Sequence, residues 1–131
     1  MGEASDERLA RLMRGPLRRP VLKRVFRAME ERYDRERADG VEAMVDFEIG
    51  GRRDGGHDHY RLMLEDGSCR VTDWRGDVPD LTISIGAPAF LRLVTGNARA
   101  DRLLVTGQLG VGGDVVLAQR LPKLFRRPRR G

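Results

Sequence analysis

Four glycines and an aspartate in the stretch VTGQLGVGGD have the composition of a loop that could hold a phosphate group. Such a loop lies between a strand and a helix N-terminus, where backbone N–H groups face the anion. The stretch lacks the Gly-Lys-Ser/Thr ending of a triphosphate-binding loop and the glycine spacing of a dinucleotide-binding loop. Asp114 also places a negative charge where the phosphate would lie. We therefore expect the glycines to shape the backbone and not to bind a nucleotide; they are Gly107, Gly110, Gly112 and Gly113.

The two histidines of the chain, His57 and His59, flank Asp58 at the start of a predicted strand. Side chains alternate along a strand, so we expect the two rings not to converge and to form a solvated loop without a metal. Ser68 and Cys69 are neighbours, but no histidine is placed with certainty to activate either one. The sequence therefore predicts a protein that is not an enzyme and that uses no cofactor.

The size and composition of the chain are those of one globular domain, with 131 residues of which 40% are hydrophobic and 34% are charged. No segment approaches the ~20 apolar residues of a membrane-spanning helix, and the first residues lack the pattern of a secretory signal. The single cysteine, Cys69, fits a reducing compartment. We therefore expect a cytoplasmic protein.

Charge is distributed unevenly: residues 1–40 carry +3, residues 41–118 carry −4 and residues 119–131 carry +6. The acidic middle argues against a nucleic-acid surface over the whole domain, whereas the basic C-terminal segment favours a local electrostatic contact. Three interpretations of that segment stay open: a solvated end, a contact with an anionic membrane, and a contact with nucleic acid. A membrane contact would use Leu124, Phe125, Arg126, Arg127, Arg129 and Arg130.

Hydrophobic periodicity predicts the elements of the N-terminal part. Apolar residues three and four positions apart predict a helix that starts at Pro20 and ends before Gly40. From Val41 the period changes to two, which is typical of half-buried strands, and Asp66-Gly67 is a hairpin turn signal. These patterns predict four strands, which begin at residues 41, 60, 69 and 81.

The C-terminal part continues with a short helix that has Pro88 in its first turn and ends at Gly96. A fifth strand is predicted from the alternation of Leu103, Val105, Leu109 and Val111, with Gly107 and Gly110 at a bend or bulge. A last helix begins at Asp114, and Pro122 separates its final turn. The strands offer one apolar face, and the helices suffice to cover only one side. The predicted fold class is therefore α+β, with a five-stranded, mostly antiparallel sheet covered on one face by helices.

The residues from Pro79 to Phe125 resemble the sterol carrier protein type two family. The resemblance lies in the order of four motifs: a Pro-Asp-x-Thr-Ile strand, a Phe-Leu-x-Leu helix that ends in Thr-Gly, a glycine-containing strand that ends in Asp, and a Leu-Ala-x-x-Leu helix. In this chain the motifs are Pro79 to Ile83, Phe90 to Leu93 with Thr95-Gly96, Gly107 to Asp114, and Leu117 to Leu121. Residues 20–78 match in layout more than in motif, and residues 1–19 hardly match.

The resemblance implies a sheet and helices that enclose a hydrophobic tunnel for a sterol, fatty acyl chain, isoprenoid or phospholipid. It also implies non-enzymatic binding and transfer or presentation of that lipid. The residues we expect to line the tunnel are Phe90, Leu91, Val94, Leu103, Val105, Leu109, Val111, Val116, Leu117 and Leu121. The expected division is an N-terminal helical extension over 1–19, a lipid-binding domain over 20–125 and a basic tail over 126–131.

Two departures from the family pattern bear on these expectations. Pro122 interrupts the helix that helps to close the tunnel in the family, and the chain ends in Arg-Arg-Gly and not in a peroxisomal address. A bacterial-type stand-alone binder fits better than a peroxisomal one. Two alternatives stay open: an accessory protein that presents substrates to enzymes of quinone or other lipophilic-metabolite synthesis, and a basic-tailed module that binds nucleic acid or protein.

Overall fold

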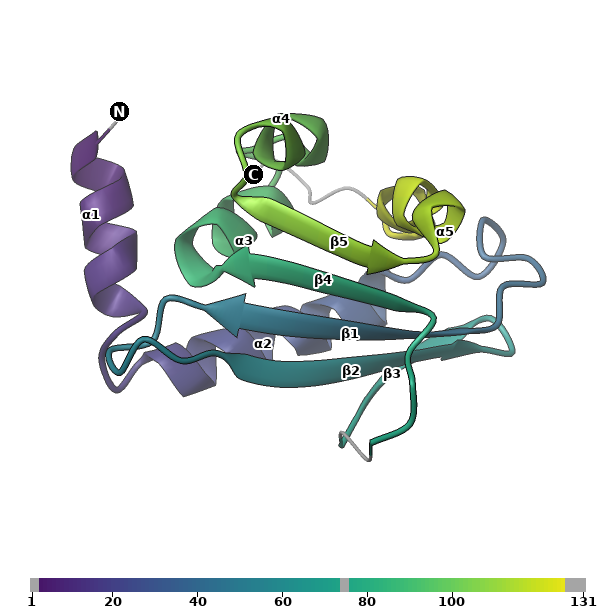
Figure 1. Ribbon diagram of the computed structural model, residues 1–131. Helices are drawn as coiled ribbons and strands as arrows, with labels where there is room; N and C mark the ends of the chain where they lie inside the picture. The colour runs from purple at the N-terminus through teal and green to yellow at the C-terminus, as the bar shows by residue number, and fades with distance from the viewer. Residues whose placement is uncertain (1–2, 74–75, 127–131) are drawn as a thin grey trace.

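The computed structural model describes residues 3–73 and 76–126, which form a five-stranded sheet and accompanying helices (Figure 1). The N-terminal part contains, in order, α1 (Glu3–Leu12), α2 (Arg18–Arg32), β1 (Ala43–Gly50), β2 (Asp58–Glu65) and β3 (Ser68–Thr72). The C-terminal part contains β4 (Leu81–Gly86), α3 (Ala87–Val94), α4 (Ala100–Val105), β5 (Leu109–Gly113), α5 (Val115–Arg120) and the 3-10 helix η1 (Leu121–Leu124). The predicted α+β class is confirmed.

The sheet has the strand order β3-β2-β1-β4-β5. Its pairs are antiparallel except for β1 and β4, which run parallel, so the prediction of a mostly antiparallel sheet is confirmed. The register aligns Val45 on β1 with Leu62 on β2 and with Leu81 on β4, and all three are buried. Because side chains alternate between faces, every second residue of the central strands joins one apolar face.

Four aromatic rings fill the space between this apolar face and the helices α2 and α3. Phe26 of α2 stacks on Tyr60 of β2, with 4.3 Å between ring centroids, and on Phe90 of α3, with 5.3 Å. Phe47 of β1 lies against both Phe26 and Phe90, at 5.5 Å and 5.9 Å. Aromatic pairs of this kind contribute about 0.5–1.5 kcal/mol each beyond the area they bury. The cluster therefore holds α2 and α3 on the same face of the sheet.

The opposite face carries a buried ion pair between Asp46 of β1 and Arg61 of β2, whose side chains are each only 2% exposed. The Arg61 guanidinium donates to both carboxylate oxygens of Asp46, at 2.6 Å and 2.9 Å, and to the carbonyl oxygen of Asp77 at 2.6 Å. Asp77 belongs to the segment that joins β3 to β4 and crosses this face (Figure 1). Burial acts to raise the pKa of Asp46, but the hydrogen bonds from Arg61 and His59 outweigh burial, so this pKa lies below its ordinary value.

Met13, which precedes α2, and Arg18, the first residue of α2, both pack closely on the rest of the fold. Met13 is fully buried, and the Arg18 guanidinium donates to the carbonyl oxygens of Met13, Ile49 and Gly50 and to the carboxylate of Asp58. The N-terminal residues are therefore tied to the ends of β1 and β2. The domain boundaries after residues 19 and 125 stay predictions.

The predicted fifth strand is wrong in its first half, because Ala100–Val105 form α4 and β5 begins only at Leu109. The end of α4 is a Schellman motif: the N–H of Gln108 donates to the carbonyl of Leu103 at 2.8 Å, and the N–H of Gly107 donates to that of Leu104 at 3.2 Å. Gly107 has a φ of 79°, the left-handed conformation that this helix ending requires. Alternation over a few apolar residues does not distinguish a strand from a short helix.

The last helical segment follows the prediction. The Asp114 carboxylate accepts a hydrogen bond from the N–H of Leu117 at 3.0 Å and so caps α5. Pro122 lies in η1, a separate 3-10 turn whose Leu121 and Leu124 are buried. Within residues 3–73 and 76–126, none of the helices has the length and apolar character needed to cross a membrane.

Candidate functional site

Eight of the ten residues predicted to line a lipid tunnel lie in or against the hydrophobic core. Five are buried and three are half-buried. They come from α3, α4, β5, α5 and η1, so the C-terminal half of the fold provides all of them. The buried ones are Phe90, Leu103, Leu109, Leu117 and Leu121, and the half-buried ones are Leu91, Val94 and Val111. Their contact with a lipid stays a prediction.

The other two predicted residues do not line the interior. Val105, the last residue of α4, is 87% exposed, and Val116 of α5 is 73% exposed. Each is exposed for a local reason: Val105 lies on a helix and not on a strand, and α5 turns Leu117 inward, so the preceding residue points outward.

Two further exposed apolar side chains on the same helices are not among the residues predicted from the sequence. Leu104 of α4 is 51% exposed and Val115 of α5 is 61% exposed. Both α4 and α5 contact β5, and in Figure 1 α4 lies near the beginning of the strand and α5 near its end. We use the name β5 apolar patch for the four exposed side chains on the helices that precede and follow β5: Leu104, Val105, Val115 and Val116. A helical interpretation of residues 100–105 would have found the α4 half of this patch.

Strand β5, which follows α4 and precedes α5 in the chain, carries few side chains. Gly110, Gly112 and Gly113 leave β5 with the side chains of Leu109 and Val111, which are buried and half-buried. A Cβ at Gly113 would lie 2.5 Å from the carbonyl oxygen of Asp80, so that position requires glycine. A Cβ at Gly112 would meet nothing within 4 Å, so the backbone there borders open space.

Two hollows on the described part of the molecule lie elsewhere. One, of about 440 Å³, is lined by Arg37, Arg120, Lys123 and Leu124. The second, of about 330 Å³, is bordered by α1 and the residues that follow it, among them Arg8, Arg11 and Leu17. None of the ten predicted lining residues borders either hollow, so the lipid tunnel stays a prediction.

The residues predicted to contact a membrane have different positions in the fold. Leu124 is 1% exposed, so the expectation that it inserts into a bilayer is wrong for this conformation. Phe125 is half-buried and its ring lies edge-on to Tyr33, with 5.4 Å between centroids. Arg126 is exposed, and its guanidinium donates to the carbonyl oxygen of Glu31. Arg127, Arg129 and Arg130 lie outside the described residues.

Ser68 and Cys69, the neighbours that could offer a nucleophile, lie at the start of β3. Cys69 is buried, and burial raises the pKa of its thiol to about 12, so the thiol stays protonated at neutral pH. The Ser68 hydroxyl donates to the carbonyl oxygen of Glu65 across the hairpin turn. The glycine-rich stretch ends at Asp114, whose carboxylate occupies the N-terminus of α5 where a phosphate would bind.

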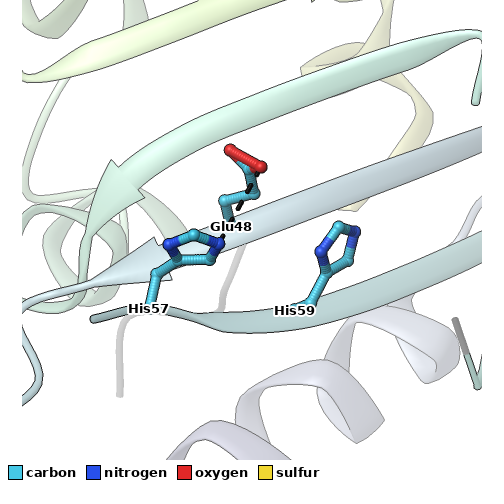
Figure 2. Close-up of side chains that lie close together, drawn as sticks. All are labelled: Glu48, His57 and His59. Atoms are coloured by element: carbon cyan, nitrogen blue, oxygen red, sulfur yellow. Dashed lines mark ion pairs between the residues drawn. The ribbon is translucent and has the colours of Figure 1, made fainter.

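The expectation that His57 and His59 do not converge is wrong. Residues two apart on a strand share a face, and β1 contributes Glu48 to the same face because it pairs with His59. One potential ligand atom from each of the three side chains lies within 4.8 Å of the others. Figure 2 shows the two rings side by side with Glu48 next to them.

Comparisons with known proteins place this geometry in context. The chain matches the sterol carrier protein domain 2 of Helicoverpa armigera with a TM-score of 0.65 and 24% identity, over 80% of this chain and 82% of that one. It matches palmitated SCP2L2 from Aedes aegypti with a TM-score of 0.54 and 18% identity, over 71% and 84% of the two chains. These likenesses show a shared fold.

A third match is to part of an enzyme, the sec-alkylsulfatase Pisa1 from Pseudomonas sp. Its TM-score is 0.63 and its identity 16%, over 77% of this chain but only 16% of the enzyme. No curated protein sequence matches the chain. The model of the SCP-2 sterol transfer family, in contrast, matches residues 22–126, which include every strand and the helices from α3 to η1. On that match, together with the sheet order and the shared fold, the chain belongs to the SCP-2 sterol transfer family.

Proposed function

We propose that the protein binds a lipid without chemical conversion and transfers or presents it, and that the lipid lies along β5 between α4 and α5. The observation that carries this placement is the β5 apolar patch. Its four side chains are 51–87% exposed on two short helices that contact the same strand. A lipid that covers the patch would remove this apolar surface from water.

The family and its relatives support a lipid as the ligand. One relative of the same fold has been described in a palmitated form. A fatty acyl chain of ~15 methylenes, fully enclosed, would contribute roughly 12 kcal/mol at ~0.8 kcal/mol per methylene. The lipid and the protein lose freedom of motion on binding, which offsets several kcal/mol of this gain. The expected affinity is therefore micromolar to nanomolar.

The packing of the core supports the β5 side as the site. Phe26, Phe47, Tyr60 and Phe90 occupy the space beneath α2 and α3 with rings in direct contact. The α4 and α5 side has short helices, exposed aliphatic side chains and a glycine-rich strand. A lipid tail inserted there would lie against the half-buried Val111 and the residues of α3 that pack on the core, Leu91 and Val94.

Binding without chemical conversion fits the state of the buried thiol. Cys69 cannot act as a nucleophile while its pKa is about 12 and its side chain is buried. The match to part of an alkylsulfatase shows that the fold also occurs inside an enzyme. In the proposed role the domain supplies a hydrophobic compartment, and any chemistry on the lipid takes place on a partner enzyme.

We further propose that the basic C-terminal surface docks on anionic membranes. Arg120 and Lys123 border a hollow next to the buried Leu124, and the exposed Arg126 follows directly. Each arginine near an anionic surface contributes about 1 kcal/mol. Removal of residues 126–131 is therefore expected to weaken sedimentation with phosphatidylserine vesicles, with no effect in neutral vesicles. Binding to DNA that is lost with the same residues would instead favour the nucleic-acid alternative.

The direct test of carriage is transfer of a fluorescent fatty acid between two vesicle populations. We expect the protein to accelerate transfer and to bind the fatty acid at micromolar concentration or below. Binding without acceleration would favour the accessory role, in which the lipid is handed to an enzyme. Failure of both measurements would refute the proposed function and leave a module that binds other macromolecules.

A further inference from the structure

Glu48, His57 and His59 form a cluster on the face of the sheet that points away from α2 and α3. Glu48 alternates along β1 with Phe47 and Ile49, which are buried on the helix side. The His57 Nε2 atom lies 4.0 Å from Glu48 Oε2, and a ligand atom from each residue lies within 4.8 Å of the other two. Figure 2 shows the three side chains together above β1 and β2.

His59 has the second contact that is characteristic of metal-binding histidines. Its Nε2 atom lies 3.0 Å from the Asp46 carboxylate, and that carboxylate is held by two hydrogen bonds from Arg61. Since the carboxylate is ionised, it favours the tautomer with the proton on Nε2, and the lone pair is then on Nδ1. A carboxylate that orients an imidazole in this way also increases the basicity of the ligating nitrogen.

Glu48 is oriented by a separate contact. The Ser84 hydroxyl on β4 donates to Glu48 Oε1 at 3.0 Å, and Oε2 is the oxygen that faces His57. Two of the three side chains of the cluster are therefore held in position by groups that belong to neighbouring strands. Such contacts hold a ligand in place before a metal arrives, so less side-chain entropy is lost on binding.

The donor set selects the class of metal. Two imidazoles and one carboxylate suit Zn²⁺ and its late first-row neighbours, whereas Mg²⁺ and Ca²⁺ prefer sites made of oxygen alone. Ligand atoms about 2.0–2.1 Å from a tetrahedral zinc are roughly 3.3 Å apart, so the cluster would contract on binding. His57 permits this contraction because its side chain is 53% exposed.

We propose that Glu48, His57 and His59 form a zinc-type metal site, with a fourth position open to water or to a ligand from outside. The site lies on the opposite side of the sheet from the α2 and α3 helices. It does not depend on the proposed lipid function, because none of its residues belongs to the β5 apolar patch. Two binding events on one small domain, a lipid and a metal, are thereby separable by mutation.

The test is calorimetric titration of the full chain with Zn²⁺ after removal of bound metal with a chelator and dialysis. We expect one equivalent to bind, with Mg²⁺ giving no heat. His57→Ala, His59→Ala and Glu48→Gln are each expected to weaken binding at least tenfold. Glu42→Gln is the matched control, since Glu42 is exposed and lies just before β1, about 20 Å of extended chain from Glu48.

The Ser84→Ala variant distinguishes an organised metal site from adventitious Zn²⁺ binding by surface histidines. Ser84 is exposed and donates no ligand, yet its loss is expected to weaken Zn²⁺ binding roughly tenfold through Glu48. Co²⁺ titration adds a second measurement, because a tetrahedral site gives intense visible absorption and an octahedral one does not. Unchanged affinity in folded His57→Ala, or absence of binding to the wild type at 100-fold excess of Zn²⁺, would overturn the proposal.

Discussion

Replacing two exposed valines with serine tests where the lipid binds. Val105 and Val116 are 87% and 73% exposed, so the folded protein without lipid loses little when they are changed. Fully burying a valine side chain contributes about 1.5 kcal/mol, and most of that remains to be gained at these positions. We assign about 1 kcal/mol to each, which gives about 2 kcal/mol for the double variant and a roughly 30-fold weaker lipid affinity.

The assay is titration of the double variant with a fluorescent fatty acid, followed by competition with unlabelled palmitate. The matched control is Val78→Ser, since Val78 is 89% exposed in the segment between β3 and β4, away from the β5 apolar patch. Both proteins should unfold at the same urea concentration as the wild type. Equal fatty-acid affinity in the double variant and the control would refute the placement of the lipid beside β5.

Three further predictions concern the elements that position the site. Gly107→Ala should destabilise the fold by about 1–2 kcal/mol in urea unfolding because of the φ of 79°, whereas Gly112→Ala, at an ordinary φ in open space, should change little. Asp114→Ala should remove the α5 cap and lower the free energy of unfolding by about 1 kcal/mol, whereas Asp114→Asn should keep most of that stability. An equal loss of stability in the two variants would contradict the capping role. The lowered pKa of Asp46 contributes stability that is present above the unfolded-state pKa near 3.8 and lost below it as pH falls through the folded-state pKa. Arg61→Met should lower the free energy of unfolding by about 3–5 kcal/mol at pH 7. The free energy of unfolding of this variant should also change less with pH in the acidic range than that of the wild type.

Local signals in the sequence were strong enough to predict most of the sheet. The period-two pattern from Val41 and the Asp66-Gly67 turn correspond to β1 and the β2–β3 hairpin, in which Asp66 and Gly67 both have positive φ values. The parallel pairing of β1 with β4 is a non-local contact that no window of sequence contains. It follows only when the whole apolar face is assembled.

Helix α4, which periodicity predicts as a strand, has a local signal in the sequence. Residues 93–97 read LVTGN and residues 104–108 read LVTGQ. Both end a helix with the same contacts, in which the threonine hydroxyl donates back to the helix and the side-chain amide of Asn or Gln donates to that hydroxyl. The prediction from periodicity treats the first copy as a helix end and the second as part of a strand. Treating the copies alike would have predicted α4.

The histidine cluster shows the limit of reasoning along one strand. His57 and His59 are two residues apart, which puts them on one face, and this much could have been inferred from the sequence. The third residue, Glu48, joins them through the register of β1 with β2, and Asp46 and Arg61 through the same pairing. Register depends on the whole sheet, so the cluster became visible only in three dimensions.

The most direct test of the central claim is native mass spectrometry of the protein purified from cells, before and after extraction with organic solvent. The account predicts an additional mass, in the range of a fatty acid, isoprenoid, sterol or phospholipid, that extraction removes and that an added fatty acid restores. A spectrum of bare protein at every stage, including after incubation with excess fatty acid, would contradict the claim that this domain binds a lipid.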